Sequence, residues 1–355
     1  MSKQIFIDIR EESAYKNSHI PGAIHLLTDT LRTSAPPFSK EDQVIFYCAK
    51  GEESEQIATF FQDLGYQAKS LNGGYLAWLM CQMTEDKSEQ IALSIRKKFH
   101  KAIFSKFTKA VKEYQLVEAG DKIAVCISGG KDSMLMAKLF QELQNHRQVP
   151  FTLEFLVMDP GYAPENRRLI EQNAKTMGIP ITVFETDIFA QVFTAPKNAC
   201  YLCAKMRRGH LYSAAKARGC NKIALGHHFD DVIETSLMSM LWGGQIQTML
   251  PKLNSTNFEG IQLIRPLYLV RELDIKHFSA YHKLHFLQCA CKFTDTCSLD
   301  GSMQSKRTEI KALIQTMQKD NPNVVHSIFK SMENVHIDAV LGYKKDGERH
   351  WFLDR

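Results

Sequence analysis

Short apolar runs alternate with stretches of helical spacing along the chain. In the first 80 residues, the runs 5–9 (IFIDI) and 44–48 (VIFYC) are typical of buried strands, whereas 55–64 repeats its apolar residues at helical spacing. Residues 68–74 (AKSLNGG) indicate a further strand and a turn. The pattern therefore predicts a small α/β unit, and the polar segment 82–90 (QMTEDKSEQ) that follows is typical of a linker.

Beyond residue 90 the pattern predicts a larger α/β domain. An apolar residue stands at every fourth position from Ile95 to Val111, which predicts one long helix over 91–114. The rest of its surface is basic, with Arg96, Lys97, Lys98, Lys101, Lys106, Lys109 and Lys112. Further on, the predicted strands are 122–128, 151–158, 181–184 and 222–228, and the predicted helices are 131–145, 164–177, 204–218 and 231–241. Because strands that alternate with helices form parallel sheets, we expect a doubly wound parallel sheet.

Length and charge fit this division. A chain of 355 residues is long enough for two domains, each with its own core. Residues 1–82 carry seven lysines and arginines against ten acids, net −3, and the remainder carries 37 against 29, net +8. Only the basic part is expected to meet a polyanion, although such an excess is also compatible with ordinary solvated surface.

Neither a membrane span nor a signal peptide is predicted. The sequence has no run of about 18 apolar residues. Its first 13 residues carry charges where a signal peptide needs an apolar core. We therefore expect a cytoplasmic protein.

The nine cysteines do not indicate a disulfide framework, because their number is odd and no export signal accompanies them. Cys81, Cys126 and Cys220 stand alone among apolar or small residues and are predicted to be structural. The remaining ones suggest chemistry. They are Cys48, Cys200, Cys203, Cys289, Cys291 and Cys297.

Cys48 ends a predicted strand and stands just before a helix. At such a turn, backbone N–H groups and the positive helix end favour the thiolate, and the same environment suits a persulfide. A buried structural cysteine is the alternative.

The surroundings of Cys48 resemble a rhodanese domain. FIDIR (6–10), SHIPGAI (18–24), the Cys48 loop and LNGGYLAW (71–78) follow the order of that family over nearly all of residues 1–80. The resemblance implies that Cys48 carries sulfur as a persulfide, supported by Asp8 and Arg10. Glu52 and Glu53 depart from the family pattern. We expect these carboxylates to raise the pKa of Cys48 and to repel thiosulfate, so that sulfur arrives from a protein persulfide.

A second loop, Ser128-Gly129-Gly130-Lys131-Asp132-Ser133, follows a predicted strand and opens a helix. Glycines let the backbone approach a phosphate, the helix start offers unpaired N–H groups, and Lys131 adds positive charge. The alternative is a simple turn without a ligand, which can have the same glycine and serine composition. The spacing differs from that of Walker-type loops.

Polar residues also cluster at the end of the predicted strand 222–228. They are His227, His228, Asp230, Asp231 and Glu234. Doubly wound sheets bind ligands at strand ends, and carboxylates there can hold Mg²⁺ between phosphate oxygens. The alternatives are polar packing for the histidines and helix capping for the aspartates.

These motifs resemble those of PP-loop ATP pyrophosphatases, and in particular the tRNA 2-thiocytidine synthetase family. The segments that carry the resemblance are SGGKDS (128–133), CYLCAKMRRGHLY (200–212), KIALGHHFDDVIET (222–235) and LIRPL (263–267). The resemblance runs from about residue 92 to the C-terminus. It implies that residues 128–133, His227 and Asp230 bind ATP with Mg²⁺, and that Asp132 and Asp231 act in catalysis together with Cys48.

Cys200 and Cys203 are spaced as metal ligands, and Arg207 and Arg208 favour their thiolates. In the family a third cysteine precedes a basic segment, which points to Cys297, with Cys289 and Cys291 in reserve. Three thiolates suit a [4Fe–4S] cluster with one open iron. A closed, four-ligand zinc site is the alternative.

The resemblance thus implies a sulfur-carrier domain (1–82), a linker with a basic helix (83–118) and a tRNA-thiolating domain (119–355). The implied partners are tRNA and a cysteine desulfurase or other persulfide donor, with a homodimer as one option. Further residues expected to contact RNA are Phe104, Tyr114, Arg207, Arg208, Lys344 and Lys345. Competing hypotheses are a PP-loop enzyme for another nucleoside or a small carbonyl compound, and a non-catalytic iron–sulfur sensor that grips RNA.

Overall fold

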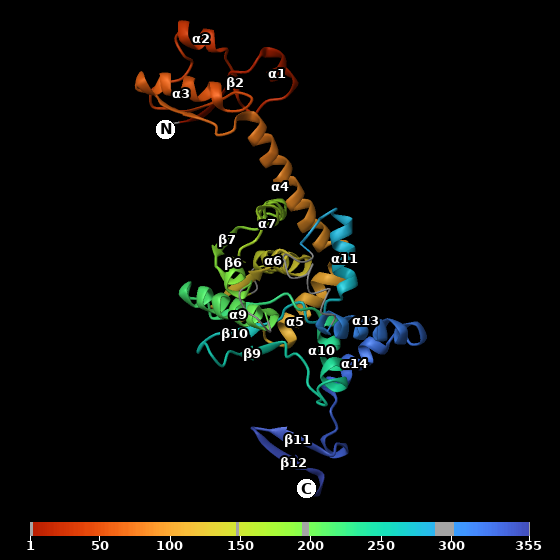
Figure 1. The fold of residues 1–355 in the computed structure, drawn as a ribbon. Coiled ribbons are helices and arrows are strands. Elements are labelled where there is room, and N and C mark those ends of the chain that lie inside the picture. Colours follow the sequence, from red (N-terminus) through yellow and green to blue (C-terminus); the bar gives the residue numbers. More distant parts are fainter. Residues whose placement is uncertain (1–2, 147–148, 194–198, 288–301, 355) are drawn as a thin grey trace. The chain divides into compact units, whose positions relative to one another are not determined.

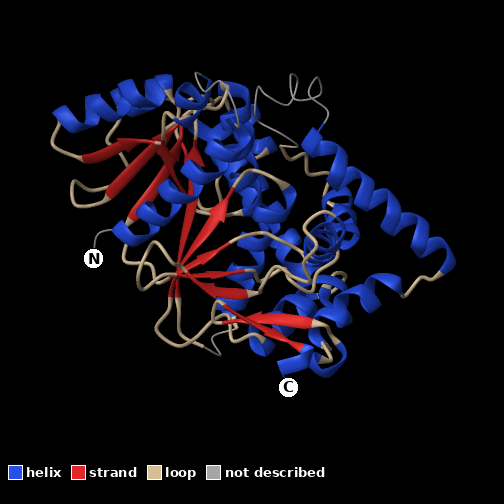
Figure 2. Ribbon diagram, turned by 60° about the horizontal axis from the view of Figure 1, so that its bottom comes forward, coloured by secondary structure: helices blue, strands red, loops and turns tan. Residues whose placement is uncertain are grey.

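The computed structural model describes residues 3–146, 149–193, 199–287 and 302–354 (Figure 1). The chain divides into two units, Met1–Glu89 and Gln90–Arg355. Each unit is built around its own sheet, with helices beside the strands (Figure 2). In the described part of the chain, no helix is long and apolar enough to cross a bilayer.

The first unit contains a four-stranded parallel sheet in the order β2-β1-β3-β4. Its elements are β1 (Gln4–Asp8), α1 (Glu12–Asn17), β2 (Ile24–His25), α2 (Thr28–Thr33), β3 (Gln43–Tyr47), α3 (Glu52–Asp63) and β4 (Gln67–Ser70). Phe38, Phe46 and Phe61 form a buried aromatic cluster between the sheet and α3, with ring centroids 5.2–6.0 Å apart. This core fixes the end of β3, where Cys48 stands.

The second unit contains a six-stranded sheet in the order β7-β6-β5-β8-β10-β9. Its strands are β5 (Lys122–Ile127), β6 (Thr152–Asp159), β7 (Ile181–Glu185), β8 (Lys222–Ala224), β9 (Lys252–Asn254) and β10 (Gln262–Ile264). All pairs are parallel except β9 with β10. The predicted parallel α/β class is confirmed, with an antiparallel edge strand that the apolar pattern did not indicate.

The strand order reverses between β5 and β8. From β5 the chain proceeds outward through β6 to β7, and it then returns to β8 on the other side. In open α/β sheets such a switch point leaves a crevice beyond the carboxyl ends of the two strands. The phosphate loop follows β5 and the histidine–aspartate segment follows β8, so the topology brings both to this crevice.

Helices and a hairpin complete the second unit. Its helices are α6 (Lys131–Asn145), α7 (Pro164–Met177), α8 (Ile188–Phe193), α9 (Ala199–Ala217), α10 (Phe229–Leu241), α11 (Glu272–Tyr281), α13 (Ser302–Asp320) and α14 (Val324–Glu333). The strands β11 (Gly342–Lys345) and β12 (Glu348–Trp351) pair as a hairpin, flanked by the short 3-10 helices Ile337–Ala339 and Phe352–Asp354.

The predicted single helix over 91–114 is interrupted. The chain forms α4 (Gly74–Arg96), a π-helix (His100–Phe104) and α5 (Ser105–Glu113). A repeat of four exceeds the 3.6 residues of an α-helical turn, so the apolar stripe would wind around a straight helix. The wider π-helical turn corrects this drift. It keeps Ile95, Phe99, Ile103 and Phe107 in one core.

The structure bears on two further expectations about this region. The polar segment 82–90, predicted as a linker, is helical and lies inside α4. Phe104, predicted to be exposed for base stacking, is 5% exposed and belongs to the core. Tyr114 is half-buried and packs edge-on against Tyr268. The Phe104 ring is therefore not free to stack on a base, whereas the contact predicted for Tyr114 stays a prediction.

Candidate active site

The phosphate loop leaves β5 and enters α6 in a sharp turn. Gly129 has a φ of +83°, and a Cβ there would lie 2.6 Å from the side chain of Ile170. The Ser133 hydroxyl accepts a hydrogen bond from the Ser128 backbone N–H (3.1 Å) and donates one to the Gly130 carbonyl (3.0 Å). The loop is therefore closed by its own serines, and the start of α6 faces the crevice.

A cavity of about 310 Å³ lies at this switch point. The phosphate loop contributes Ser128, Asp132 and Ser133. The opposite side comes from the segment after β8 and from α9. The remaining lining residues are Cys126, Ile127, Met158, Tyr162, Arg207, Leu211, Leu225, Gly226, His227 and Asp231. The cavity thus brings together the phosphate loop, the strand-end cluster and the helix of the Cys-x-x-Cys motif.

Three polar atoms of lining residues have no hydrogen-bond partner within the described residues, although each is buried. They are Asp132 Oδ1, Arg207 Nε and His227 Nδ1. Buried polar atoms are rarely left unsatisfied without a functional reason. A carboxylate, a guanidinium and an imidazole that line one cavity suit a ligand with phosphate and hydroxyl groups.

His227 is held neutral. Burial lowers its pKa to about 4, and the nearby Arg265 and Arg307 act in the same direction against the attraction of Asp231. The ring therefore offers hydrogen bonds without positive charge at neutral pH.

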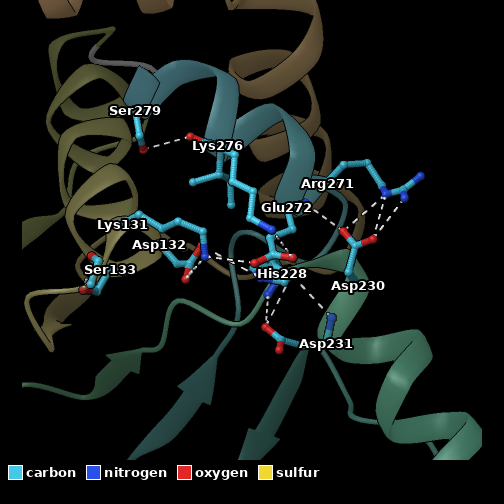
Figure 3. A network of polar contacts seen from close by, with 12 residues as sticks. Lys131, Asp132, Ser133, His228, Asp230, Asp231, Arg271, Glu272, Lys276 and Ser279 are labelled. Carbon is cyan, nitrogen blue, oxygen red and sulfur yellow. Dashed lines mark hydrogen bonds and ion pairs between the residues drawn. The ribbon is translucent and has the colours of Figure 1, made fainter. Parts of the chain in front are cut away.

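Charged side chains form a closed chain of contacts next to the cavity, and Figure 3 shows the part of it that contains Lys131, Asp132, His228, Asp231 and Glu272. Lys131 lies 3.1 Å from both Asp132 and Glu272. Lys311 lies 3.7 Å from both Glu272 and Glu234. Arg307 joins Glu234 (2.7 Å) to Asp231, and His228 stands between Asp231 (3.4 Å) and Asp132 (3.9 Å). We call these eight residues the charge ring.

Burial opposes ionisation of Glu272, but Lys131, Lys276 and Lys311 lower its pKa to about 2. Lys131 itself is retained as a cation, since Asp132 and Glu272 raise its pKa against the effect of burial. Lys131 and Glu272 are therefore both charged, and α6, α10, α11 and α13 all contribute residues to the ring.

The two aspartates after β8 have different surroundings. Asp231 closes a capping box, accepting a hydrogen bond from the His228 N–H (3.0 Å) while its own N–H donates to the His228 ring. Asp230 accepts from Arg271 and from the Glu272 N–H (2.7 Å). Asp231 lines the cavity and Asp230 fixes the start of α11. Asp231 therefore has the helix-capping role that was the alternative to ligand binding. The predicted role of Asp230 in binding the nucleotide stays a prediction.

Cys203 lies close to the cavity. A turn after β6, in which Asp159 accepts from the Tyr162 N–H (2.7 Å), places Tyr162 against Arg207 of α9. Burial raises the pKa of Tyr162; hydrogen bonding to Arg207 lowers it, while Asp159 and Cys203 raise it. Cys203 also packs against the apolar cluster of Met158, which lines the cavity. Sequence analysis did not single out Tyr162. The turn sequence MDPGY (158–162) at the end of a buried strand would have indicated a residue at the ligand-binding edge of the sheet.

The other predicted metal ligands are not covered by the structure. Cys200 belongs to α9, but its side chain lies outside the described residues, as do Cys289, Cys291 and Cys297. Among the described residues no group of three or more metal-binding side chains occurs. The cluster therefore remains a prediction.

In the first unit, the Cys48 sulfur sits in a cradle of donors. The Gly51 N–H lies 3.1 Å and the Ser54 hydroxyl 3.6 Å from the sulfur. Burial alone would raise the pKa of the Cys48 thiol, but hydrogen bonds from Ser54, Gly51 and Lys50 lower it below its ordinary value. The expectation that Glu52 and Glu53 raise this pKa is wrong. Both side chains are exposed, and the amides of the loop decide its direction.

Asp8 and Arg10 hold the Cys48 loop in place through Tyr75. Asp8 is completely buried and pairs with Arg10 at 2.6 Å. The Arg10 guanidinium stacks 3.8 Å from the Tyr75 ring centroid, and the Tyr75 N–H donates to the Cys48 carbonyl (2.8 Å). Gly74 permits this close approach, since a Cβ there would lie 2.7 Å from the Gly51 nitrogen.

Residues 99–292 match the family model of the PP-loop domain, and residues 1–81 match that of the rhodanese-like domain. This chain belongs to the PP-loop family. Its relatives include the tRNA-cytidine(32) 2-sulfurtransferase of Citrifermentans bemidjiense, 34% identical over 232 residues, which are 64% of this chain and 88% of the relative. The Alcanivorax borkumensis protein of that name is 34% identical over 67% of this chain and 82% of its own length.

The PP-loop fold also appears in a solved relative. The U34-tRNA thiolase NcsA from Methanococcus maripaludis, solved with its [4Fe-4S] cluster, superposes with a TM-score of 0.51. It is 22% identical, and the match covers 64% of this chain and 76% of that protein. At this identity the likeness concerns the fold alone.

Proposed function

We propose that this PP-loop protein uses ATP to thiolate a pyrimidine of tRNA, with C2 of cytidine 32 as the target. The observation that carries the proposal is the cavity shared by the phosphate loop and Arg207 of the Cys-x-x-Cys helix. The names of the 34% identical relatives support the substrate. We assign residues 1–82 to sulfur carriage and 119–355 to catalysis, with 83–118 between them.

The phosphate loop would hold the triphosphate of ATP. Ser128 and Ser133 line the cavity, and α6 begins between them at Lys131. A helix start of this kind favours anions. Lys131, now paired with Asp132 and Glu272, would exchange a carboxylate for phosphate oxygens.

Asp132 and Asp231 would hold Mg²⁺. Both line the cavity, and Asp132 Oδ1 has no hydrogen-bond partner among the described residues. Mg²⁺ commonly takes one or two carboxylates together with phosphate oxygens and water. When bound, it neutralises the charge that develops on the pyrophosphate leaving group.

The chemistry proceeds in two displacements. The C2 oxygen of the base attacks the α-phosphorus, an O–P bond forms and pyrophosphate leaves. Hydrosulfide then attacks C2, and AMP departs with the original oxygen. Arg207 is placed to stabilise the phosphate of the adenylated base, because it lines the cavity together with the phosphate loop.

Sulfur would enter through a persulfide on Cys48, loaded by a cysteine desulfurase or other persulfide donor. The donors around the Cys48 sulfur favour its anion, which is the form that accepts sulfur. Release of the outer sulfur as hydrosulfide consumes two electrons, which a thiol reductant supplies.

Cys200, Cys203 and Cys297 would hold the [4Fe–4S] cluster, with Cys289 and Cys291 as alternatives to Cys297. When bound, a cluster with three protein ligands supplies an open iron that can hold sulfide. The nearness of Cys203 to Tyr162 and the cavity supports this assignment.

The test is an anaerobic reaction of the full chain with a tRNA transcript, ATP, Mg²⁺, sulfide and a thiol reductant. Mass spectrometry of the digested tRNA should find 2-thiocytidine. It should be lost when cytidine 32 is replaced by uridine and in the Asp132→Asn variant. A thiolated uridine, or no sulfur in any nucleoside, would contradict the proposal.

A further inference from the structure

Two neighbouring stretches of the second unit are rich in cations and contain no carboxylate. Residues 97–101 have the sequence KKFHK, and residues 276–283 have the sequence KHFSAYHK. The first joins α4 to the π-helix, and the second runs through α11 to the residues just after it. We call the exposed cations Lys97, Lys98, Lys101, Lys276 and Lys283, together with Tyr281, the basic face.

The two stretches pack side by side. Phe99 contacts the rings of Phe278 and Tyr281, with centroids 5.3 and 5.6 Å apart. The Lys98 ammonium lies 3.8 Å from the centroid of the Tyr281 ring. Ser94, one turn before Lys98, lies 2.6 Å from the His282 ring. The cations of the basic face therefore belong to one continuous surface.

Among the described residues, four of the five lysine charges on this surface are not neutralised, and only Lys276 pairs with a carboxylate. Lys97, Lys98, Lys101 and Lys283 are exposed and lie within ion-pair distance of no carboxylate in the described part of the chain. Tyr281 is 53% exposed, and the Lys98 ammonium lies over its ring. Unpaired cations around an exposed aromatic ring are the elements with which proteins bind single-stranded nucleic acid.

The basic face is connected to the candidate active site through α11. Lys276 pairs with Glu272 (3.1 Å), one turn earlier on the same helix. Glu272 in turn pairs with Lys131 of the phosphate loop (3.1 Å). A strand bound along α11 would therefore lead toward the nucleotide cavity.

We propose that the basic face binds the sugar–phosphate backbone of an RNA loop, with an unpaired base stacked on Tyr281. This inference rests on the proposed function, which makes RNA the substrate, and it adds the surface through which RNA is held. An acidic protein would match the lysines equally well, but it would not require an exposed ring among them. The exposed Tyr281 therefore favours RNA.

The test measures binding of an unmodified tRNA transcript to the full chain by fluorescence anisotropy at several salt concentrations. Lys97→Gln, Lys98→Gln and Lys101→Gln are combined in one variant. The matched control combines Lys175→Gln, Lys216→Gln and Lys330→Gln, which removes the same charge from exposed positions elsewhere. A third variant, Tyr281→Leu, removes the ring and keeps every charge.

We expect the triple variant to bind at least about tenfold more weakly and the slope of log K against log salt to fall by about 2. The control should keep the wild-type slope. Tyr281→Leu should bind about tenfold more weakly with an unchanged slope, because stacking does not release counterions. An unchanged affinity and slope in the triple variant, or an equal loss in the control, overturns the inference.

The same tRNA, analysed for thiolated nucleosides, separates this inference from the proposed function. If wild-type protein thiolates tRNA but the triple variant binds it normally, the basic face is wrong and the function stands. If tRNA binds through the basic face and acquires no sulfur, the surface stands and the proposed function is wrong.

Discussion

The ammonium of Lys131 lies 3.1 Å from the carboxylate of Glu272, so an ion pair joins the first residues of α6 and α11. Lys131 is the cation of the phosphate loop, and Glu272 holds it beside the cavity rather than among the lining residues. A triphosphate has to compete with this carboxylate for Lys131.

Glu272→Gln should therefore tighten ATP binding. Without the carboxylate of Glu272, Lys131 keeps Asp132 as its only ion-pair partner among the described residues and the loop becomes more positive, so we expect the Kd for ATP to fall about fivefold. Isothermal titration calorimetry with a non-hydrolysable analogue measures it, and Glu165→Gln, at an exposed carboxylate of α7, is the control. Weaker binding in Glu272→Gln would mean that Glu272 positions Lys131 for phosphate instead of competing for it.

The buried His227 predicts a loss of stability in mild acid. Its pKa is about 4 in the folded protein, against about 6.5 in the unfolded chain. Between these values the unfolded chain binds the extra proton, so the contribution is complete above about pH 6.5 and declines as the pH falls toward 4. From about pH 7.5 to about pH 5 the free energy of unfolding should fall by about 2 kcal/mol from this residue alone.

Urea unfolding at these two pH values measures the effect. The His227→Asn variant lacks the titrating group and should lose about 2 kcal/mol less than the wild-type protein over the same interval. An equal loss in both proteins would show that His227 is already accessible to protons in the folded state.

The ion pair between Arg307 and Glu234 leads to a prediction in which the stability of the protein depends on pH in the opposite direction. The Glu234 side chain is 3% exposed, and burial raises its pKa while Arg307, at 2.7 Å, opposes the rise. Arg307→Gln leaves Glu234 with only the more distant Lys311 (3.7 Å). We expect the free energy of unfolding to drop by about 2 kcal/mol.

The loss should be larger at about pH 8 than at about pH 5. A carboxylate whose folded pKa is raised contributes stability at low pH, when it is protonated, and loses it as the pH rises. Urea unfolding of Arg307→Gln at both values checks the direction. Adding Glu234→Gln should recover most of the loss, and failure to do so would place the effect of Arg307 elsewhere.

Local patterns predicted β1, β3 to β8 and both loops, because a strand needs only a short apolar run and a phosphate loop needs glycines at a strand end. They did not predict the short strands β2, β9 and β10 or the hairpin of β11 and β12. SGGKDS and CAKGEES therefore indicated their sites directly. Local sequence patterns could not predict the charge ring. Glu272 and Arg307 stand more than 30 residues from their partners in α6 and α10, and their positions depend on how α11 and α13 pack.

The helix over 91–114 shows where periodicity misleads. A spacing of four marks one face correctly, as the shared core of Ile95, Phe99, Ile103 and Phe107 confirms. It does not reveal that the backbone must widen into a π-helix to keep that face inward. In this arrangement the Phe104 side chain is buried in the core, and the side chains of Lys97 and Lys101 are exposed on the surface.

The cradle around Cys48 makes a final prediction about the sulfur carrier. The Ser54 hydroxyl lies 3.6 Å from the Cys48 sulfur, and hydrogen bonds from Ser54 contribute to the lowered pKa of that thiol. Ser54→Ala removes the hydroxyl and keeps the backbone N–H, so the midpoint of Cys48 alkylation by iodoacetamide should shift to higher pH. The shift must be read at Cys48 by peptide mass spectrometry, because other thiols react as well.

Turnover of the Cys48→Ser variant then separates carriage from catalysis. With a cysteine desulfurase as donor, tRNA thiolation should slow at least about tenfold, because the seryl hydroxyl cannot form a persulfide. With inorganic sulfide the rate should equal that of the wild-type protein, since sulfur no longer passes through residue 48. Cys200→Ser should abolish both reactions. Equal slowing of Cys48→Ser with both donors would instead assign Cys48 a role in the thiolation step itself.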